Sequence, residues 1–299
     1  MFKFKNLALA SVSLLTLSTP ALAQDDSAGS GSANDIVVTA RRVEERLQDV
    51  PISITVFNQQ QLANKNVTTA TDLANYTPSL SADNNFGPDN TSFAIRGFVQ
   101  DIGTAPSVGT YFGDVVTPRG ATNGQPVGDG ASAGDFFDLQ NVQVLKGPQG
   151  TLQGRNTTGG AVLFVPQKPT DKLEGYVQGG YGNYNMWRLQ GVLNVPLSDT
   201  FLVRLGVDHM KRDGYLNNVS GIGPKHFGDI DYWAARLSIV ANLTPNLENY
   251  TIASYSNSKN NGAVQKLIAA EPTQAPFGGF AAGQLARQGS NFYNVALPI

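Results

Sequence analysis

The chain has 299 residues, enough for one large domain or two ordinary domains with their own cores. Its 21 basic and 23 acidic residues give a formal net charge of −2, a balance that does not indicate nucleic acid as a partner. The absence of cysteine excludes disulfides, so stability must come from burial or from a membrane.

Residues 1–23 show the three parts of a secretory signal peptide in order. Lys3 and Lys5 give a positive start, an apolar run follows at Leu7–Leu17, and residues 21–23 form a small-x-small cleavage site. Cleavage after Ala23 would leave 19 basic and 23 acidic residues, a net charge of −4. No apolar run reaches the ~20 residues of a membrane helix, but an exported protein can still cross a membrane as a β-barrel.

Residues 24–46 form a leader that contains one β-prone segment. Residues 24–34 are small, polar and rich in Gly and Ser, which indicates a flexible linker. The β-prone segment consists of Asp35, Ile36, Val37, Val38, Thr39 and Ala40. It is either the first strand of the next domain or a peptide that adds as a strand to another protein's sheet, and composition does not decide between them.

Residues 47–169 are predicted to form a compact α+β domain. Alternation and turn signals predict short strands at 51–57, 93–97, 108–112, 142–145 and 161–165, and short helices at 58–65 and 69–76. Long loops rich in Gly and Asn lie at Asp83–Asn90 and Gly113–Gly134. Loops of that length in a small domain are usually functional or disordered.

The densest signal lies between the last two of these strands. Glycines recur there at turn positions, beside the basic residues Lys146 and Arg155. The glycines and the proline are Gly147, Pro148, Gly150, Gly154, Gly159 and Gly160. No glycine is followed by Lys-Ser or Lys-Thr, so the segment lacks the spacing of a phosphate-binding P-loop.

Residues 170–299 change to long alternating strands, apolar on one face and polar on the other. A soluble sheet with one wet face gives the same alternation, but aromatic residues near strand ends and turns of alternating length favour strands of a membrane barrel. A fifth strand is expected at 247–255 and a long external loop after Asn257. The apolar faces include Leu173, Val177, Tyr181, Trp187, Leu189, Leu193, Phe201, Leu205, Val207, Trp233, Leu237 and Leu243; the polar faces include Glu174, Gln178, Arg188, Gln190, Asn194, Arg204, Asp208, Arg236 and Ser238.

The glycine-rich segment resembles the end of the plug domain of TonB-dependent receptors. The family pattern is a Lys/Arg-Gly-Pro-x-Gly run, then Gly-Arg and Gly-Gly, between two strands. It is matched by residues 146–150, by Gly154-Arg155 and by Gly159-Gly160. The strand at 93–97, with Arg96 and Gly97, resembles the family's central plug strand, and Asp35–Ala40 resembles its TonB box. The resemblance covers about residues 1–260 and implies an α+β plug domain followed by antiparallel transmembrane β-barrel strands, 22 of them in the family.

The resemblance also implies a function and its partners. Such a receptor takes up a scarce nutrient, by family default a ferric siderophore or other iron complex, which binds plug apical loops near Asp83–Asn90 and Gly113–Gly134. The periplasmic domain of TonB would capture the TonB box by strand addition and pull, since the outer membrane has no ATP. Arg96, Lys146 and Arg155 are expected to pair with acidic residues of the lumen. Outer-membrane lipid is the expected surrounding, with no cofactor, no bound metal and no catalytic residue.

Other interpretations rest on weaker signals. Residues 130–134 match the G-x-S-x-G pattern of hydrolases but lie in a loop, and His209 and His226 lack the spacing of a metal site. A passive porin or an exported β-rich adhesin is the open alternative, although neither needs a TonB box. Five strands cannot close a barrel, so the chain is interpreted as a fragment of a longer gene product.

Overall fold

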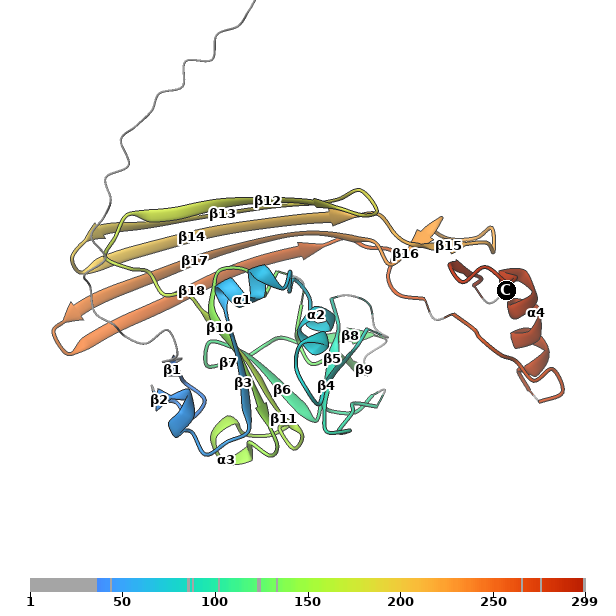
Figure 1. The fold of residues 1–299 in the computed structure, drawn as a ribbon, viewed down its shortest axis with the longest axis horizontal. Helices are drawn as coiled ribbons and strands as arrows, with labels where there is room; N and C mark the ends of the chain where they lie inside the picture. Colours follow the sequence, from blue (N-terminus) through green and yellow to red (C-terminus); the bar gives the residue numbers. More distant parts are fainter. Residues whose placement is uncertain are drawn as a thin grey trace, which may run out of the picture. The chain divides into compact units, whose positions relative to one another are not determined.

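The structure is a computed structural model of the chain. It describes residues 37–43, 45–84, 87, 89–101, 103–122, 125–132, 134–264, 266–274 and 276–297 (Figure 1). The expected signal peptide and linker, together with Asp35 and Ile36, lie outside these residues. Within the described part, no helix has both the length and the apolar character needed to cross a membrane.

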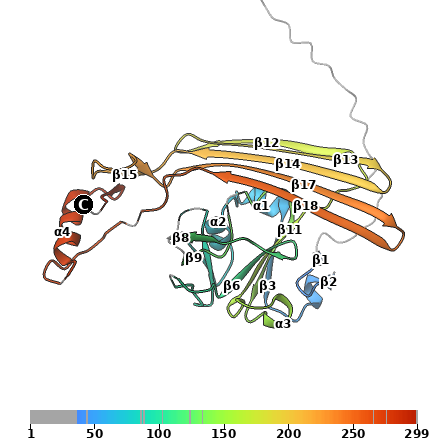
Figure 2. The same ribbon diagram turned by 180° about the vertical axis from the view of Figure 1, so that it is seen from behind.

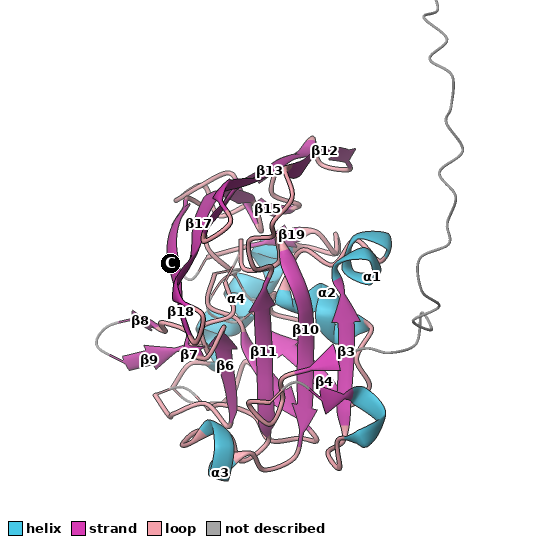
Figure 3. Cartoon of the chain, turned by 90° about the vertical axis from the view of Figure 1, so that its left-hand side faces the viewer, coloured by secondary structure: helices cyan, strands magenta, loops and turns pink. Residues whose placement is uncertain are grey.

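A five-stranded sheet forms the centre of the first half of the described chain. Figure 3 shows its main strands side by side. The spatial order is β3 (Ile54–Asn58), β10 (Leu139–Lys146), β11 (Gly160–Pro166), β6 (Val108–Phe112) and β7 (Val115–Val116). Neighbours are antiparallel except β11 and β6, which run parallel. The strands that flank the glycine-rich segment, β10 and β11, are therefore both interior strands of the sheet.

Two short helices follow β3, and each begins at a capping box. Asn58 caps α1 (Gln59–Asn64) by accepting from the Gln61 N–H at 2.8 Å. Thr69 caps α2 (Ala70–Asn75), and the Asp72 side chain accepts from the Thr69 N–H at 2.9 Å. Such reciprocal caps satisfy backbone donors that a helix start leaves unpaired. The remaining small elements are β1 (Val37–Val38), β2 (Glu45–Arg46), a 3-10 turn at Leu47–Asp49, β4 (Leu80–Asp83), β5 (Ser92–Ile95), β8 (Gly120–Thr122), β9 (Gln125–Val127) and α3 (Gly150–Gln153).

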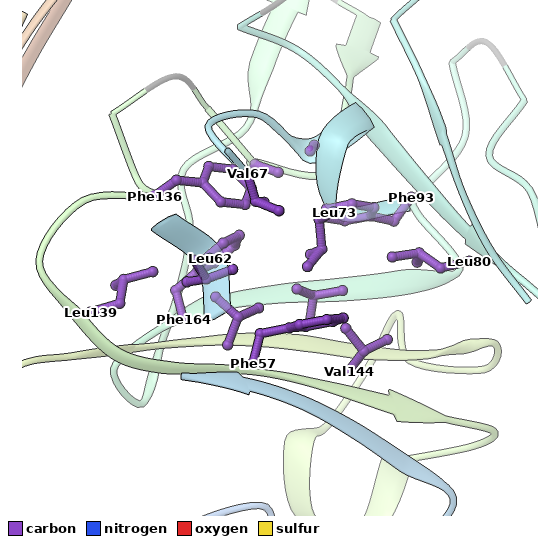
Figure 4. Packing of buried hydrophobic residues seen from close by; sticks show 14 of the residues in the cluster. Phe57, Leu62, Val67, Leu73, Leu80, Phe93, Phe136, Leu139, Val144 and Phe164 are labelled. Atoms are coloured by element: carbon purple, nitrogen blue, oxygen red, sulfur yellow. The ribbon is translucent and has the colours of Figure 1, made fainter. Parts of the chain in front are cut away.

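Apolar side chains pack on both faces of this sheet. On one face, α1, α2 and β5 cover a cluster that includes Phe57, Leu62, Leu73, Phe93, Val144 and Phe164 (Figure 4). On the other face, a smaller cluster joins Ala40, Tyr111, Leu145, Ala161 and Leu163. Full burial of each large side chain contributes roughly 1.5–3 kcal/mol, so this half of the chain has a core of its own.

The predicted elements of this half are largely present, with shifted ends. Both helices and the strand at 108–112 are found, while β10 is longer than predicted and the strand expected at 51–57 begins only at Ile54. Ile54 of β3 is only half-buried, and so is the nearby Ile52, because β3 lies at the edge of the sheet. The loops at 83–90 and 113–134 also contain or adjoin β4, β7, β8 and β9, short strands that carry too few residues to show a period.

The second half forms a separate antiparallel sheet of long strands. Figures 1 and 2 show them side by side. Their order follows the chain: β12 (Glu174–Gly182), β13 (Met186–Ser198), β14 (Phe201–Arg212), β17 (Ile230–Thr244) and β18 (Leu247–Ser258). The five strands expected from the sequence are thus all found, and a short turn at 183–185 joins β12 to β13.

Burial in this sheet is inverted relative to a water-soluble sheet. Val177 is 80% exposed, and Leu189, Leu205 and Trp233 are also exposed. On the opposite face Asn194 and Asp208 are fully buried, and so nearly is Arg236. Alternation with the apolar residues outward is the pattern of membrane barrels, so the predicted orientation of the faces is confirmed.

Segments beyond the long strands form a small structure of their own. A three-stranded sheet joins β15 (Leu216–Asn218) to β16 (His226–Phe227) and β19 (Asn294–Val295). The stretch after residue 257, expected as a loop, contains the helix α4 (Gly278–Gln288). Its alanines, glycines and glutamines give little apolar periodicity, which is why the sequence did not indicate a helix.

We expect residues 47–169 to fold alone as a soluble domain and residues 170–299 to be insoluble without detergent. The first segment has its own core, whereas the second exposes its apolar face and leaves β12 and β18 as open edges. Separate expression, followed by size-exclusion chromatography and limited proteolysis, tests this. A soluble, cooperatively unfolding monomer from 170–299 would contradict the membrane orientation of its faces.

We also expect Gly160→Ala to destabilise the first domain by at least ~2 kcal/mol. Gly160 has φ +152°, and a Cβ there would collide with the Leu145 carbonyl oxygen across the β10–β11 pair. Thermal unfolding of residues 47–169 measures the effect. Gly150→Ala is the matched control, since nothing lies within 4 Å of a Cβ at that position. Equal melting of both variants would show that the close strand approach is not needed.

Candidate functional site

The described part of the candidate coupling segment, residues 37–40, is docked rather than extended into solvent. Val37 and Val38 form β1, which pairs antiparallel with β2 opposite Arg46 and Glu45. Val37 is 40% exposed, whereas Val38 and Ala40 are fully buried. The segment therefore pairs within a small hairpin of its own and adds no strand to the central sheet.

Few contacts hold this segment to the domain. The side-chain amide of Gln143 on β10 donates to Thr39 Oγ1 at 3.2 Å, and that of Gln153 on α3 donates to the Ala40 carbonyl at 3.4 Å. The Ala40 methyl packs with Tyr111 and its cluster on the second face of the sheet. Each hydrogen bond contributes about 0.5–1.5 kcal/mol, and burial of the Val38 side chain adds roughly 1.5–3 kcal/mol, so the segment is attached by a few kcal/mol in all.

The glycine-rich segment builds the tight connection between β10 and β11. The Gly147 N–H donates to the Gly159 carbonyl at 2.9 Å, and the Gln149 N–H donates to the Thr157 carbonyl at 3.0 Å. Gly147 and Gly154 have φ of +110° and +82°, a region that favours glycine. A Cβ at Gly159 would lie 2.8 Å from Phe98 Cβ. These residues act through the backbone, which explains why several small residues recur there.

The three basic residues singled out in the sequence do not share one partner. Arg96 has φ +54° and lies beside Gly147, and burial together with this guanidinium lowers the pKa of Lys146. Within the part of the chain that the structure describes, Arg96, Lys146 and Arg155 form no ion pair. Their pairing with acidic lumen residues therefore stays a prediction.

A buried ion pair joins the two halves of the chain instead. Arg204 on β14 contacts Asp138, just before β10, through Nε to Oδ2 at 2.8 Å and Nη2 to Oδ1 at 2.6 Å. Both side chains are less than a tenth exposed, and Arg204 Nη1 also lies 3.5 Å from a Glu174 carboxylate oxygen. Two parallel charge-assisted bonds give this contact a defined orientation.

Arg236 on the neighbouring strand β17 contacts the same segment before β10, at Phe137. Its guanidinium lies between the rings of Phe112 and Phe137, 4.3 Å and 4.5 Å from their centroids, and Nη1 donates to the Phe137 carbonyl at 2.8 Å. Gly206, opposite Arg236 in register, leaves room for the Phe137 ring, since a Cβ there would lie 2.7 Å from it. We call Arg204 and Arg236 the arginine clamp.

Hydrogen bonds also fix the connection between the two halves of the chain, at residues 170–172. Asn194 on β13 is fully buried, and its side chain accepts from the Thr170 N–H at 3.0 Å and donates to the Thr170 and Lys172 carbonyls at 2.9 Å and 2.6 Å. The sequence placed Asn194, Arg204 and Arg236 on the polar faces but assigned them no role. Asp138 was not singled out, and its partners lie more than sixty residues away in the chain.

A cleft of about 450 Å³ lies between the β4–β5 region and the segments beyond the long strands. We call it the apical cleft. Its lining is uncharged except for one aspartate and consists of Ser81, Ala82, Asp83, Asn84, Ser92, Phe93, Ala94, Val99, Gln100, Tyr215, Ala263 and Val264. The first loop expected to bind ligand thus contributes Asp83 and Asn84. No described residue of the second loop, 113–134, lines this cleft.

The second loop is instead anchored by a buried carboxylate. Asp129 Oδ2 accepts from the Phe93 N–H at 2.5 Å, and Oδ1 accepts from the Ala131 N–H at 3.2 Å. Burial raises the pKa of Asp129 to about 7 despite these bonds. Ser132, the serine of the G-x-S-x-G match, donates to Asp135 in a turn, which is not the strand-to-helix elbow of a hydrolase.

Comparison with known proteins gives a family match within the first half of the chain. Residues 46–161 match the family model described as the TonB-dependent receptor plug domain. The pesticin receptor of Yersinia pestis is 30% identical over 170 residues, which is 56% of this chain and 24% of that protein. The vitamin B12 transporter BtuB of Vibrio vulnificus is 30% identical over 231 residues, or 74% of this chain and 34% of that protein. The chain thus spans about a quarter to a third of the length of these relatives.

Solved structures extend the likeness to the long strands. The ferric yersiniabactin uptake receptor FyuA of Yersinia pestis is similar with a TM-score of 0.56 and 25% identity, over 69% of this chain and 31% of that one. The ferripyoverdine receptor of Pseudomonas aeruginosa, bound to ferripyoverdine, has a TM-score of 0.59 at 18% identity, over 75% and 27%. These relatives are transport receptors rather than enzymes.

We expect Arg204→Ala to destabilise the complete protein by about 3–5 kcal/mol, because it leaves the Asp138 carboxylate buried without its guanidinium. Thermal unfolding in detergent measures the loss. Lys168→Ala is the control, since the Lys168–Glu248 pair is half-exposed and should contribute less than about 1 kcal/mol. The double variant Asp138→Ala, Arg204→Ala should recover part of the loss. Equal losses of stability in Arg204→Ala and in the control Lys168→Ala would contradict a role for the clamp.

Proposed function

We propose that the chain belongs to the TonB-dependent receptors and that its protein takes up a scarce nutrient across the bacterial outer membrane, a ferric siderophore or another iron complex, with energy supplied through TonB. The observation that carries this proposal is a plug domain joined by buried contacts to strands whose apolar face is outward. A passive porin needs no such domain. Higher expression of the complete gene under iron starvation than under iron repletion would support an iron complex as the substrate.

A location in the outer membrane is supported by the apolar face of the long strands and by the export signal expected from the sequence. The exposed apolar face of β12–β18 suits lipid, and the signal peptide expected at residues 1–23, with cleavage before Gln24, would export the protein. Residues 24–46 would be the leader, 47–169 the plug and 170–299 the first part of the barrel. The girdle near the strand ends includes Trp187 and Trp233, which enclose His209 at ring distances of 4.5 Å and 4.0 Å.

Asp35–Ala40 would be the peptide that TonB captures. Strand addition uses backbone hydrogen bonds of an extended peptide, and the Val37–Val38 pair is already paired with β2. Capture therefore requires that the hairpin and the contacts from Gln143 and Gln153 be released first. The few kcal/mol that hold the segment are small enough for binding energy at another site to offset.

The ligand would enter at the apical cleft. This cleft brings plug residues of β4 and β5 together with Tyr215, Ala263 and Val264, from segments beyond the long strands. Contact between the two is direct, since the Asn260 side chain donates to Asp89 Oδ2 at 2.6 Å. A ligand bound there would touch both the plug and the barrel loops.

Val37→Pro in the complete receptor should abolish uptake while ligand binding at the cell surface remains. Proline removes a backbone donor and fixes φ, which prevents strand addition to TonB. Radiolabelled ferric-complex binding and uptake by whole cells measure the two effects separately. Val37→Ala, which keeps the N–H, should retain uptake. Loss of both binding and uptake in Val37→Pro would indicate that the segment is only a structural strand of the plug.

A further inference from the structure

The second loop, residues 113–134, returns to the core of the plug through one buried aspartate. Asp129 is only 1% exposed. Its Oδ2 accepts from the Phe93 N–H of β5, 36 residues earlier in the chain, and its Oδ1 accepts from the Ala131 N–H. Its own N–H donates to the Thr91 carbonyl at 3.1 Å. A single residue therefore fastens the end of this loop to β5.

The backbone on either side of Asp129 is shaped for this position. Gly128 and Gly130 have φ of +69° and +95°, a region that favours glycine. A Cβ at Gly128 would lie 2.8 Å from the Asn90 backbone, and a Cβ at Gly130 would collide with Thr117 Oγ1. The Thr117 hydroxyl also donates to the Asp129 carbonyl at 3.3 Å. The two glycines thus let the turn come close enough for the carboxylate to reach β5.

The Asp129 carboxylate has hydrogen bonds but no cation beside it. Within the described part of the chain it forms no ion pair. The strands β5 and β6, which lie against it through Phe93 and Thr110, contain no charged residue. The cations closest in the sequence are placed elsewhere, because Arg96 lies beside Gly147 and Arg119 is exposed.

The other titratable groups of this region have different surroundings. The Tyr111 ring of β6 packs into the smaller cluster on the second face of the sheet. Asp135, in the same loop region, is also buried, and burial raises its pKa, while hydrogen bonds from Ser132 and the charge of Arg236 lower it. Asp135 thus has a cation within reach of its charge, whereas Asp129 depends on neutral groups alone.

Burial without a cation disfavours the charged form of a carboxyl group. It raises the pKa of Asp129 to about 7, although the Phe93 and Ala131 N–H groups and the Thr110 hydroxyl lower it. A released loop would expose Asp129 to water and return its pKa toward the ordinary value of 3.8. The docked loop therefore binds a proton that the released loop has lost between about pH 4 and pH 7. Docking weakens as the pH rises through this range and is constant above it.

We propose that Asp129 is a protonation-controlled latch, which holds the second loop on β5 when its carboxyl group is neutral and loosens it when the group is charged. A neutral carboxyl group still accepts from the Phe93 N–H and can donate its proton to Thr110 Oγ1, which is buried and has no other partner among the described residues. Because Ser92, Phe93 and Ala94 of β5 line the apical cleft, the latch also acts on a wall of that cleft. The inference concerns the docking of the loop and holds whichever solute the receptor carries.

A spin label on the loop tests the latch in the complete receptor, purified in detergent. Arg119→Cys, made in a receptor free of other cysteines, places the label at an exposed position two residues after Thr117. Electron paramagnetic resonance then gives the ratio of mobile to immobile label from about pH 5 to about pH 9. This ratio should rise roughly tenfold for each pH unit up to about pH 7 and stay level above it.

Variants assign the rise to Asp129. Asp129→Asn keeps the shape of the neutral form at every pH, so the label should stay immobile throughout. Thr110→Val removes a hydroxyl that favours the charged form, so the rise should extend to higher pH. Asp135→Asn should leave a rise that still ends near pH 7. Asp114→Asn is the matched control, because this exposed aspartate follows β6, and its spectra should match those of the unaltered receptor.

Three results would overturn the latch. They are a mobile fraction that does not change with pH, the same rise in Asp129→Asn as in the unaltered receptor, and a rise in Thr110→Val that ends at the same or a lower pH. Thermal unfolding at about pH 5 shows which variants are folded. If Asp129→Asn does not fold, the direction of the change in Thr110→Val decides.

Discussion

The second sheet has its charges on the side that is buried, and the rest of the structure depends on how those charges are compensated. Arg204, Asp208 and Arg236 lie on the inner face of neighbouring strands, where water does not reach them. Asp208 accepts two hydrogen bonds from Arg188 and one from Tyr232, so its charge is compensated by residues of the same sheet. Arg204 instead pairs with Asp138 of the plug, with Glu174 of β12 as a more distant partner at 3.5 Å, and Arg236 donates to the Phe137 carbonyl of the plug. The buried arginines of the long-stranded sheet therefore depend on the plug for their partners.

This compensation makes the attachment of the plug uneven along its chain. The segment that leads into β10 and the connection at Thr170 are held by buried ionic and amide contacts. The candidate coupling segment at residues 37–40 is held by two side-chain amides, by pairing with β2 and by the buried side chains of Val38 and Ala40. A buried ion pair that loses one partner costs about 3–5 kcal/mol, several times a single neutral hydrogen bond. A pull on the leader would meet the weak contacts first.

The packing of the plug sheet explains how one small domain can contain both a strongly held and a weakly held segment. The central strands β10 and β11 approach closely at Gly160, and the core on the α1–α2 face is continuous with them. The coupling segment covers only part of the other face, over Tyr111 and Leu145. Its removal would uncover a few apolar side chains while the larger core stays intact.

The sequence by itself determined most of the helices and strands, and which face of each long strand is apolar. Period-two alternation in β12–β18 indicated apolar residues outward, since side chains of a strand point alternately to opposite faces. The glycine-rich block at 146–160 was likewise readable, because positive φ and close strand approach exclude most other residues. What these patterns contain is local, and each can be recognised from neighbours a few positions away.

Only the tertiary structure decided which of these residues meet. Asp138 and Arg204 are 66 residues apart, and nothing in either local pattern distinguishes them from other polar residues on strands. The docking of Thr39 on Gln143 spans 104 residues, and the apical cleft joins β4 to Val264. The chosen basic residues Arg96, Lys146 and Arg155 looked equivalent to Arg204 and Arg236 in sequence. Long-range pairing depends on how sheets fold onto one another, and a single sequence carries that information only in its summed packing energy.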